Sequence, residues 1–412
     1  MSSVSDPNHW RRQFLLFATA IGFLALGGGI FESTFNNFLN DVFHMSAETR
    51  GKLEFPRELP GFMVAIFAGL LFFLSETKTA AIAALVTAAG ITGLVLCGGN
   101  YQIMFVSMII WSAGAHLGMP MQSSISLALA EGKSAGSLMG RIGSYANIAM
   151  IGGAGIVWLG MGYLHFEYAT VFAIGAGSAV CAAFVFSRIK IHKPHSRKRS
   201  KLLFRRRYGL YYILCVLYGA RKQLFLTFGP LVLIKIFNQP PTTIAKLMII
   251  SAVLGIIFRP ALGWLIDHLS ERAILMADAV LLVLVCLGYG FGGRWLPMPY
   301  GMYLVFACYV LDVLLIAVDM ARSIYLDKIA LSREDVAPTL TLGVTIDHAV
   351  SMSIPTAFGL IWGIDKDYGY SWVFVGAAGL AMLGFVAASF IRVPNKAANL
   401  VQAEAALAEE LV

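Results

Sequence analysis

Long apolar runs dominate this 412-residue chain and set the strongest limit on its fold. A helix needs about 20 apolar residues to cross a bilayer, and twelve runs of roughly that length follow one another. Only 13% of the residues are charged, whereas soluble domains carry about 25%. We therefore predict an all-α integral membrane protein with twelve transmembrane helices in direct contact with the lipid bilayer. The expected spans are residues 14–39, 58–75, 79–99, 101–129, 138–163, 166–187, 208–236, 244–266, 273–292, 300–328, 338–363 and 370–391.

A basic segment divides the twelve runs into two groups of six. The segment "RIKIHKPHSRKRSKLLFRRR" holds ten Lys and Arg residues. No nucleic-acid-binding fold accompanies it, so we interpret it as a solvated loop beside anionic lipid and expect no nucleic-acid partner. The predicted domains are an N-terminal six-helix bundle (1–187), a basic cytoplasmic linker (188–207), a C-terminal six-helix bundle (208–396) and a cytoplasmic tail (397–412).

The distribution of Lys and Arg predicts the orientation of the chain. With the N-terminus inside, the inner segments hold 20 of the 31 Lys and Arg residues, the outer loops hold seven and the spans hold four. Short cytoplasmic loops of membrane proteins carry such an excess of cations. We therefore predict a multi-pass protein of the cytoplasmic (inner) membrane with both termini in the cytoplasm.

The two halves of the sequence repeat each other. When residues 12–78 are shifted by 194 positions without gaps, Arg12 meets Arg206 and Gly69 meets Gly263. Matched charges and glycines at one offset are harder to obtain by chance than matched apolar residues. Two six-span halves in parallel repeat are the arrangement of a large class of secondary transporters.

One local motif accompanies this repeat. The stretch "GWLIDHLSER" resembles the loop signature of the major facilitator superfamily, with Gly263, Asp267 and Arg272 at its defining positions. The resemblance implies a bacterial-type secondary transporter that works as a monomer by alternating access. It also implies that these three residues gate the cytoplasmic side. The first-half copy of the motif has Phe73 at the acidic position, which puts a symmetric latch in doubt.

Cations inside the spans are costly and usually face the interior of a bundle. Arg221 is expected near the midplane of the seventh span, and Arg259 lies slightly inward in the eighth. A guanidinium binds a carboxylate or phosphate through two parallel bonds, so both are candidate substrate contacts. The alternative is that each neutralises Asp312 or Asp347. Lys222 points about 100° away from Arg221 and either snorkels or pairs with an acid.

Other polar residues at membrane depth complete the predicted site. Glu32 and Asp347 are the expected proton-coupling acids, because coupling needs a carboxylate whose proton changes with access. Asp319 and Arg322 lie three residues apart on one helix face, which predicts a structural or gating pair. The expected substrate-binding residues are Arg221, Arg259, Asn36, Asn147, His116 and Asp312.

Enzyme chemistry finds little support in the sequence. The five cysteines form no C-x-x-C pair, and the "GKS" at 132–134 lacks the glycine that a phosphate loop needs, since Leu127 stands there. No set of nucleophile, base and acid emerges. We expect no enzyme, no cofactor and no bound metal.

Three functions remain open at this point. The leading hypothesis is a proton-coupled secondary transporter of a small, anionic organic solute. The alternative is a proton-driven exporter of hydrophobic or cationic compounds, of the multidrug type. A membrane scaffold or sensor that transports nothing is the third, and it has only the short acidic tail to support it. Substrate, direction and coupling ion are left undecided by the sequence.

Overall fold

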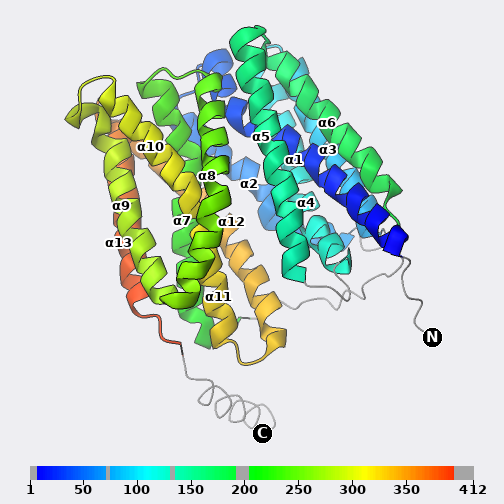
Figure 1. Cartoon of the computed structure of the whole chain (residues 1–412). Helices are drawn as coiled ribbons and strands as arrows, with labels where there is room; N and C mark the ends of the chain where they lie inside the picture. The colour runs from blue at the N-terminus through cyan, green and yellow to red at the C-terminus, as the bar shows by residue number, and fades with distance from the viewer. Residues whose placement is uncertain (1–6, 71–74, 130–134, 192–203, 394–412) are drawn as a thin grey trace. The chain divides into compact units, whose positions relative to one another are not determined.

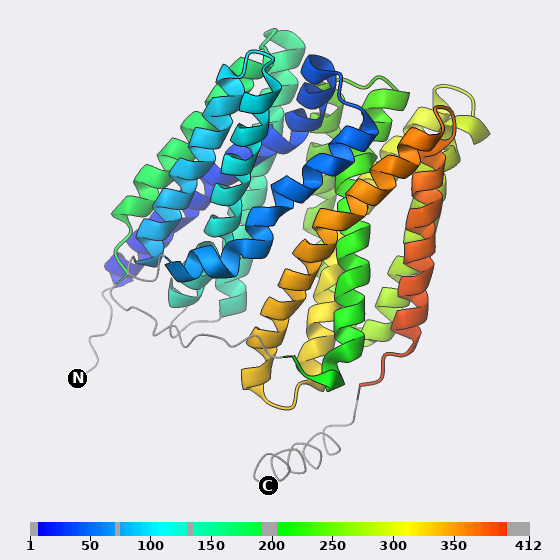
Figure 2. The same ribbon diagram turned by 180° about the vertical axis from the view of Figure 1, so that it is seen from behind.

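The structure, a computed structural model, describes residues 7–70, 75–129, 135–191 and 204–393, where all regular structure is helical (Figures 1 and 2). The predicted tail and most of the predicted linker lie outside these residues. The helices are α1 Pro7–Phe43, α2 Ala47–Leu70, α3 Glu76–Leu96, α4 Tyr101–Leu129, α5 Ala135–Tyr163, α6 Tyr168–Arg188, η1 Arg206–Tyr208, α7 Gly209–Leu231, η2 Val232–Ile236, α8 Pro241–His268, α9 Glu271–Trp295, α10 Tyr300–Leu315, η3 Ile316–Val318, α11 Asp319–Ile329, α12 Arg333–Ile364 and α13 Gly369–Ser389.

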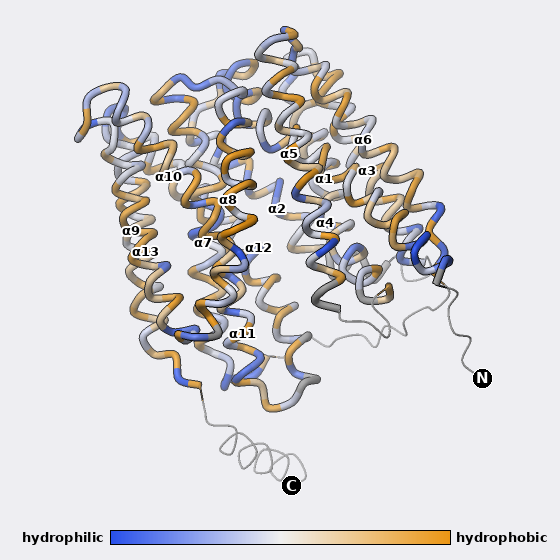
Figure 3. Tube along the Cα trace, in the orientation of Figure 1, coloured by the Kyte–Doolittle hydropathy of each residue, from blue (hydrophilic) through white to orange (hydrophobic). Residues whose placement is uncertain are grey.

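The prediction of an all-α membrane protein is confirmed. Ten segments among the described residues are long and apolar enough to cross a membrane, and Tyr300–Ile329, which joins α10 to α11, is one of them. α2 and α7 are not among the ten, and they complete the twelve expected spans. Figure 3 shows apolar residues along the helices and hydrophilic residues gathered mainly near their ends.

The second helix differs most from its prediction. α2 begins at Ala47, whereas the span was expected to begin at residue 58. Its first turns are rich in charged residues and contain Pro56, so they carry no apolar signal. They are nevertheless helical, because much of this polar surface is paired and buried inside the protein.

The chain forms two compact units. Unit 1 comprises residues 1–45, 56–197 and 238–252, and unit 2 comprises residues 46–55, 198–237 and 253–412. Two short segments therefore belong to the opposite unit from the one that the sequence halves would assign. The start of α2 (46–55) is part of unit 2, and the start of α8 (238–252) is part of unit 1.

The helix pairings inside the two units repeat. In unit 1, α3 packs against α4 and α6, and α1 packs against α5 and α6. In unit 2, α9 packs against α10 and α13, and α7 packs against α12 and α13. Each pairing of the first half thus has a counterpart six spans later, as the sequence repeat predicts.

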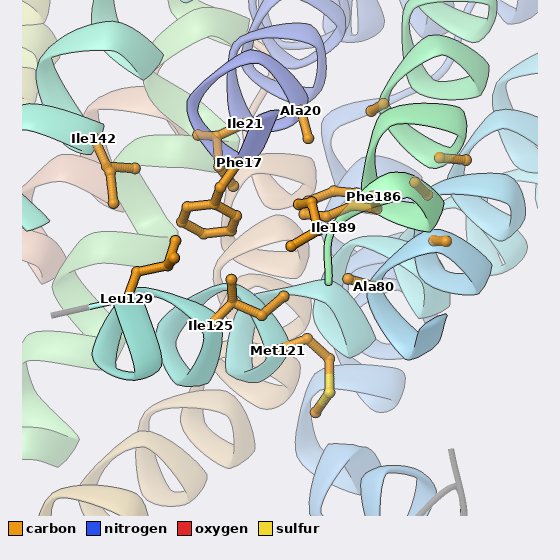
Figure 4. Close-up of a cluster of buried hydrophobic side chains, with 14 of the residues drawn as sticks. Phe17, Ala20, Ile21, Ala80, Met121, Ile125, Leu129, Ile142, Phe186 and Ile189 are labelled. Carbon is orange, nitrogen blue, oxygen red and sulfur yellow. The ribbon is translucent and has the colours of Figure 1, made fainter. Parts of the chain in front are cut away.

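A cluster of buried apolar side chains closes one end of unit 1 (Figure 4). Phe17 of α1 lies between Ile125 and Leu129 of α4 on one side and Phe186 of α6 on the other. The Phe17 and Phe186 rings are 6.2 Å apart between centroids and tilted by 60°. This contact joins the first turns of α1 to the last turns of α4 and α6.

Glycines set the distance between α1 and α5. A Cβ atom built on Gly29 would lie within 2.3 Å of the Met150 carbonyl oxygen, and one on Gly153 within 2.1 Å of the Leu26 carbonyl oxygen. The two backbones are therefore in direct contact, as small residues allow in membrane helices. Gly152, one position earlier, has open space around it.

This crossing makes a testable prediction. Gly153→Ala should destabilise the protein by about 1–3 kcal/mol, because the new methyl group meets backbone atoms that cannot move aside. Gly152→Ala is the matched control and should be neutral or slightly stabilising, since alanine is the better helix former. Thermal unfolding in detergent measures both variants. Equal melting temperatures for the two would contradict the direct backbone contact.

The beginning of unit 2 is held by a buried tyrosine that follows the predicted linker. The Tyr208 hydroxyl donates to Asp335 Oδ2 at 2.7 Å and accepts from the Leu331 N–H at 3.2 Å. Arg205 Nε lies 3.3 Å from the same Asp335 oxygen. Burial raises the pKa of Tyr208 to about 12 from its ordinary 10.0. The hydrogen bond to Asp335 adds to this rise, whereas Leu331 and Arg205 act against it.

This shift predicts a loss of stability at alkaline pH. The folded state keeps the Tyr208 proton at pH values where the unfolded state releases it, so stability falls as pH rises from 10 to 12. Tyr208→Phe should cost about 1–3 kcal/mol at pH 8 through the lost hydrogen bond to a charged acceptor. The difference in melting temperature between wild type and variant should shrink above pH 10. A constant difference up to pH 11 would contradict the assignment.

Candidate functional site

Arg221 lies in the middle of α7 and is almost completely buried. Its Nη2 atom is 3.3 Å from Oδ1 of Asp312 on α10, and both side chains are less than 10% exposed. Burying a cation together with an acid lowers the cost of burying either. The pairing that the sequence left as an alternative for Arg221 is therefore present. The pair uses one nitrogen of the guanidinium, and Nε and Nη1 are buried without a hydrogen-bond partner among the described residues.

Lys222, the next residue, reaches a different helix. Its Nζ atom lies 2.5 Å from Oδ2 of Asp347 on α12, so the lysine pairs with an acid instead of snorkelling. Gly219 lets the two helices approach at this point, since a Cβ atom there would lie 3.1 Å from the Cα of Asp347. The second oxygen of Asp347, Oδ1, is buried and makes no hydrogen bond with the described residues.

Gln223, the next residue along α7, contacts a third helix. Its Nε2 atom donates to Oε2 of Glu54 at 2.6 Å, and Glu54 also pairs with Arg50 one turn away in the start of α2. All three side chains are buried. Successive residues of a helix point about 100° apart, so Arg221, Lys222 and Gln223 can contact three helices. They bind α10, α12 and the start of α2.

The expected pair of Asp319 and Arg322 forms at the start of α11. The two side chains are 2.5 Å apart between Oδ1 and Nη2. The Arg322 guanidinium also lies over the Tyr218 ring, 4.3 Å from its centroid. Its Nε and Nη1 atoms are buried without a hydrogen-bond partner in the described chain. The cation–π contact ties α11 to α7, one helical turn before Arg221.

In unit 1, His116 belongs to a buried polar group between α4 and α2. Its Nδ1 atom is 2.9 Å from the Ser112 carbonyl oxygen, and its Nε2 atom is 3.7 Å from Oε2 of Glu58. Glu58 in turn pairs with Arg57 at 2.6 Å. Arg57 and Glu58 are the eleventh and twelfth residues of α2, next to the position where the span was expected to begin.

Several predicted residues lie apart from these groups. Glu32 on α1 and Arg259 on α8 are exposed, and no ion pair of Arg259 is found within the described ranges. Asn36 is buried, and Asn147 donates to the Ala252 carbonyl oxygen at 3.3 Å. The roles of these residues in binding and coupling stay predictions.

The predicted gating motif is only partly visible. The side chain of Asp267 lies outside the described part of the structure. A Cβ atom on Gly263 would meet no atom within 4 Å, so α8 makes no close contact here with the described helices. Arg272 is exposed at the start of α9. The gating role of the three residues stays a prediction.

Two interior acids were not among the residues predicted from the sequence. Asp278 lies in the ninth apolar run, and counting every acid of that run would have found it. Glu54 is completely buried, but it lies in the charged start of α2 that the sequence reading left outside the span. The buried partner of Glu54 is 169 residues away in the sequence, so no local sequence pattern predicts the contact between them.

Each unit contains a partly open cavity. The cavity of unit 1 has a volume of about 270 Å³ and a mainly apolar wall with Gly28, Ala83, Trp111 and Gln122. The cavity of unit 2 has about 60 Å³ and a wall with several charged residues. The first is large enough for an apolar group of a ligand, and the second is large enough for a few water molecules.

The family follows from the sequence once this architecture is known. The family model described as Major Facilitator Superfamily matches residues 20–330. The chain belongs to the major facilitator superfamily. It is therefore a membrane transporter and not an enzyme, and the family predicted from the Gly263 motif is confirmed.

Solved structures of other family members share this fold. A mutant of the nucleoside transporter NupG is 15% identical, with a TM-score of 0.77 over 92% of this chain and 99% of that one. A bacterial homologue of the human lysosomal transporter Spinster is 12% identical, with a TM-score of 0.70 over 94% and 98%. A D-xylose–proton symporter is 16% identical, with a TM-score of 0.64 over 93% and 98%. No curated protein sequence matches the chain.

The contact between α7 and α12 can be tested through its ion pair. Lys222→Met or Asp347→Leu alone leaves one buried charge without a partner and should cost about 3–5 kcal/mol. The double variant removes both charges and should recover most of that loss. Thermal unfolding of the three variants in detergent gives the coupling between the two sites. Additive losses in the double variant would show that the pair does not form.

Proposed function

We propose that this transporter carries a small anionic organic solute across the cytoplasmic membrane by alternating access, in a process coupled to protons. One observation carries the proposal. Arg221 is buried in the middle of α7 with two guanidinium nitrogens that no described residue binds. Unused buried donors are costly, which favours a ligand or water that satisfies them.

The geometry of the guanidinium supports an anionic ligand. Asp312 contacts a single nitrogen at 3.3 Å, a distance at the long end for a charged hydrogen bond. Each bidentate edge of an arginine, Nη2 together with either Nε or Nη1, matches a carboxylate or a phosphate through two parallel bonds. A solute with such a group would gain a bidentate contact that Asp312 does not make.

The second pair offers a way to couple the solute to protons. A proton bound by Asp347 would remove the charge that holds Lys222, and the lysine would become free to attract an anion. A proton and a monovalent anion that bind together add no net charge to the interior, which keeps the cost of burial low. Glu32, the other predicted coupling acid, is exposed on α1.

Transport by purified protein in liposomes tests this proposal. Candidate anions come from a screen for metabolites that raise the melting temperature, since a ligand of the folded state stabilises it. Arg221→Gln should reduce uptake under an inward proton gradient at least tenfold, and Arg259→Gln should reduce it if that exposed residue contributes. Arg392→Gln, an exposed arginine after the last helix, is the control. Normal uptake by the Arg221 variant would overturn the anion site.

The cavity of unit 1 favours a second candidate, export of hydrophobic compounds. Its wall is mainly apolar, and its volume of about 270 Å³ suits part of a lipophilic molecule. In cells that lack other exporters, the protein should lower the accumulation of a lipophilic dye. Ala83→Leu, which narrows the cavity, should abolish the effect. Equal accumulation with and without the protein for every dye tested would remove this candidate.

A further inference from the structure

A small charged cavity inside unit 2 has Arg221, the proposed anion contact, in its wall, and its other charged groups have no role in the functions described so far. It has a volume of about 60 Å³ and lies between α7, α9, α11 and α13. In this conformation, the volume leaves room for a few water molecules and not for an organic solute. Two arginines in its wall, Arg221 and Arg322, are over 90% buried and each carries two unpartnered nitrogens. Such donors call for water in the cavity.

The charges around the cavity come from four helices. α7 contributes Arg221 and the Tyr218 hydroxyl, and α11 contributes Asp319 and Arg322. α13 contributes only Leu380, Ala381 and Gly384 to the wall. α9 contributes the carboxyl group of Asp278 to the wall. Asp312 of α10 is the acid that pairs with Arg221.

Asp278 is the exception in this set. Arg221 is paired with Asp312 and Arg322 with Asp319, whereas Asp278 forms no ion pair within the described residues. Its Oδ1 atom is buried and has no hydrogen-bond partner there. Two guanidinium groups and three carboxylates leave one negative charge uncompensated. A single bound cation would make the group neutral.

The chemistry of the wall selects the kind of cation. A metal ion needs several oxygen ligands, typically six or more for the hard cations. The cavity offers two carboxyl groups and one hydroxyl, faces two guanidinium cations, and is otherwise lined by Leu, Val, Ala and Gly. A proton needs one carboxylate oxygen and a water molecule to deliver it.

We propose that Asp278 binds a proton that is exchanged through water in this cavity. The proton adds to a carboxylate oxygen of Asp278 from a hydronium ion and returns to water on release. The cavity reaches from the middle of α7, at Arg221, to the start of α11, at Asp319. Coupling of this proton to transport rests on the proposed function, whereas the binding site itself does not.

Infrared difference spectroscopy on the full chain in liposomes tests the site without transport. Acidification in sodium-free buffer should produce the C=O band of a protonated carboxyl group, and this band should be absent in Asp278→Asn. Asp367→Asn, at an exposed loop position, should keep it. Asp278→Glu should keep a shifted band, which guards against a loss caused by misfolding. An unchanged band in Asp278→Asn, or one that sodium ions abolish in the wild type, would overturn the proposal.

Transport then separates this site from the proposed function. If the site is coupled, Asp278→Asn should still exchange labelled solute across the membrane but should not accumulate it under a proton gradient. Loss of the infrared band with normal gradient-driven accumulation would support the site and refute its coupling. Failure of the wild type to transport any anion would count against the proposed function and leave the infrared result standing.

Discussion

The polar triplet of α7 is the contact on which the rest of unit 2 depends. Arg221, Lys222 and Gln223 bind acids on α10, α12 and the start of α2. In the hydrocarbon of a membrane, apolar surfaces gain little from packing against each other, so polar contacts and close packing hold helices together. A single turn of α7 thus fixes three neighbours. These contacts also explain why one helix tolerates three polar residues at mid-depth.

α1 in the first half and α7 in the second half pack against their neighbours in two different ways. Under the sequence repeat, the triplet corresponds to Gly27, Gly28 and Gly29 of α1. There α1 packs against α5 and α6 through direct backbone contact, and α7 packs against the corresponding α12 and α13. The fold is shared by the halves, whereas at these three positions only the second half carries charges. Because close packing alone can hold such helices together, we interpret the costly charges of α7 as part of the proposed function.

The sequence predicted the helices well, because each apolar run signals its own span. It also predicted that Lys222 would find an acid if it did not snorkel, and that Asp319 would pair with Arg322, since that spacing acts within one helix. It left two acids open as partners of Arg221 and could not predict the partner of Gln223, because these contacts join residues 91 and 169 positions apart. The hydropathy pattern did not reveal Glu54 for another reason. In sequence, a charged helix end resembles a loop even when the structure buries it.

The placement of Glu32 shows a related limit. Depth along a helix can be counted from the sequence, but the direction of a side chain depends on which neighbours the helix finds. Glu32 and Ser33 are adjacent at the same depth of α1, and the first is exposed while the second is buried. The weak amphipathicity of membrane helices leaves this choice to tertiary packing.

Incomplete pairing is what separates the interior of unit 2 from a purely structural salt-bridge network. A structural pair gains most when both oxygens and several nitrogens are bound, because each unsatisfied buried group costs free energy. Arg221, Asp347 and Arg322 instead keep buried atoms without partners among the described residues. A transporter must exchange its internal contacts for contacts with a solute and then restore them. Pairs held by one bond on each side can make that exchange at a lower cost than fully satisfied ones.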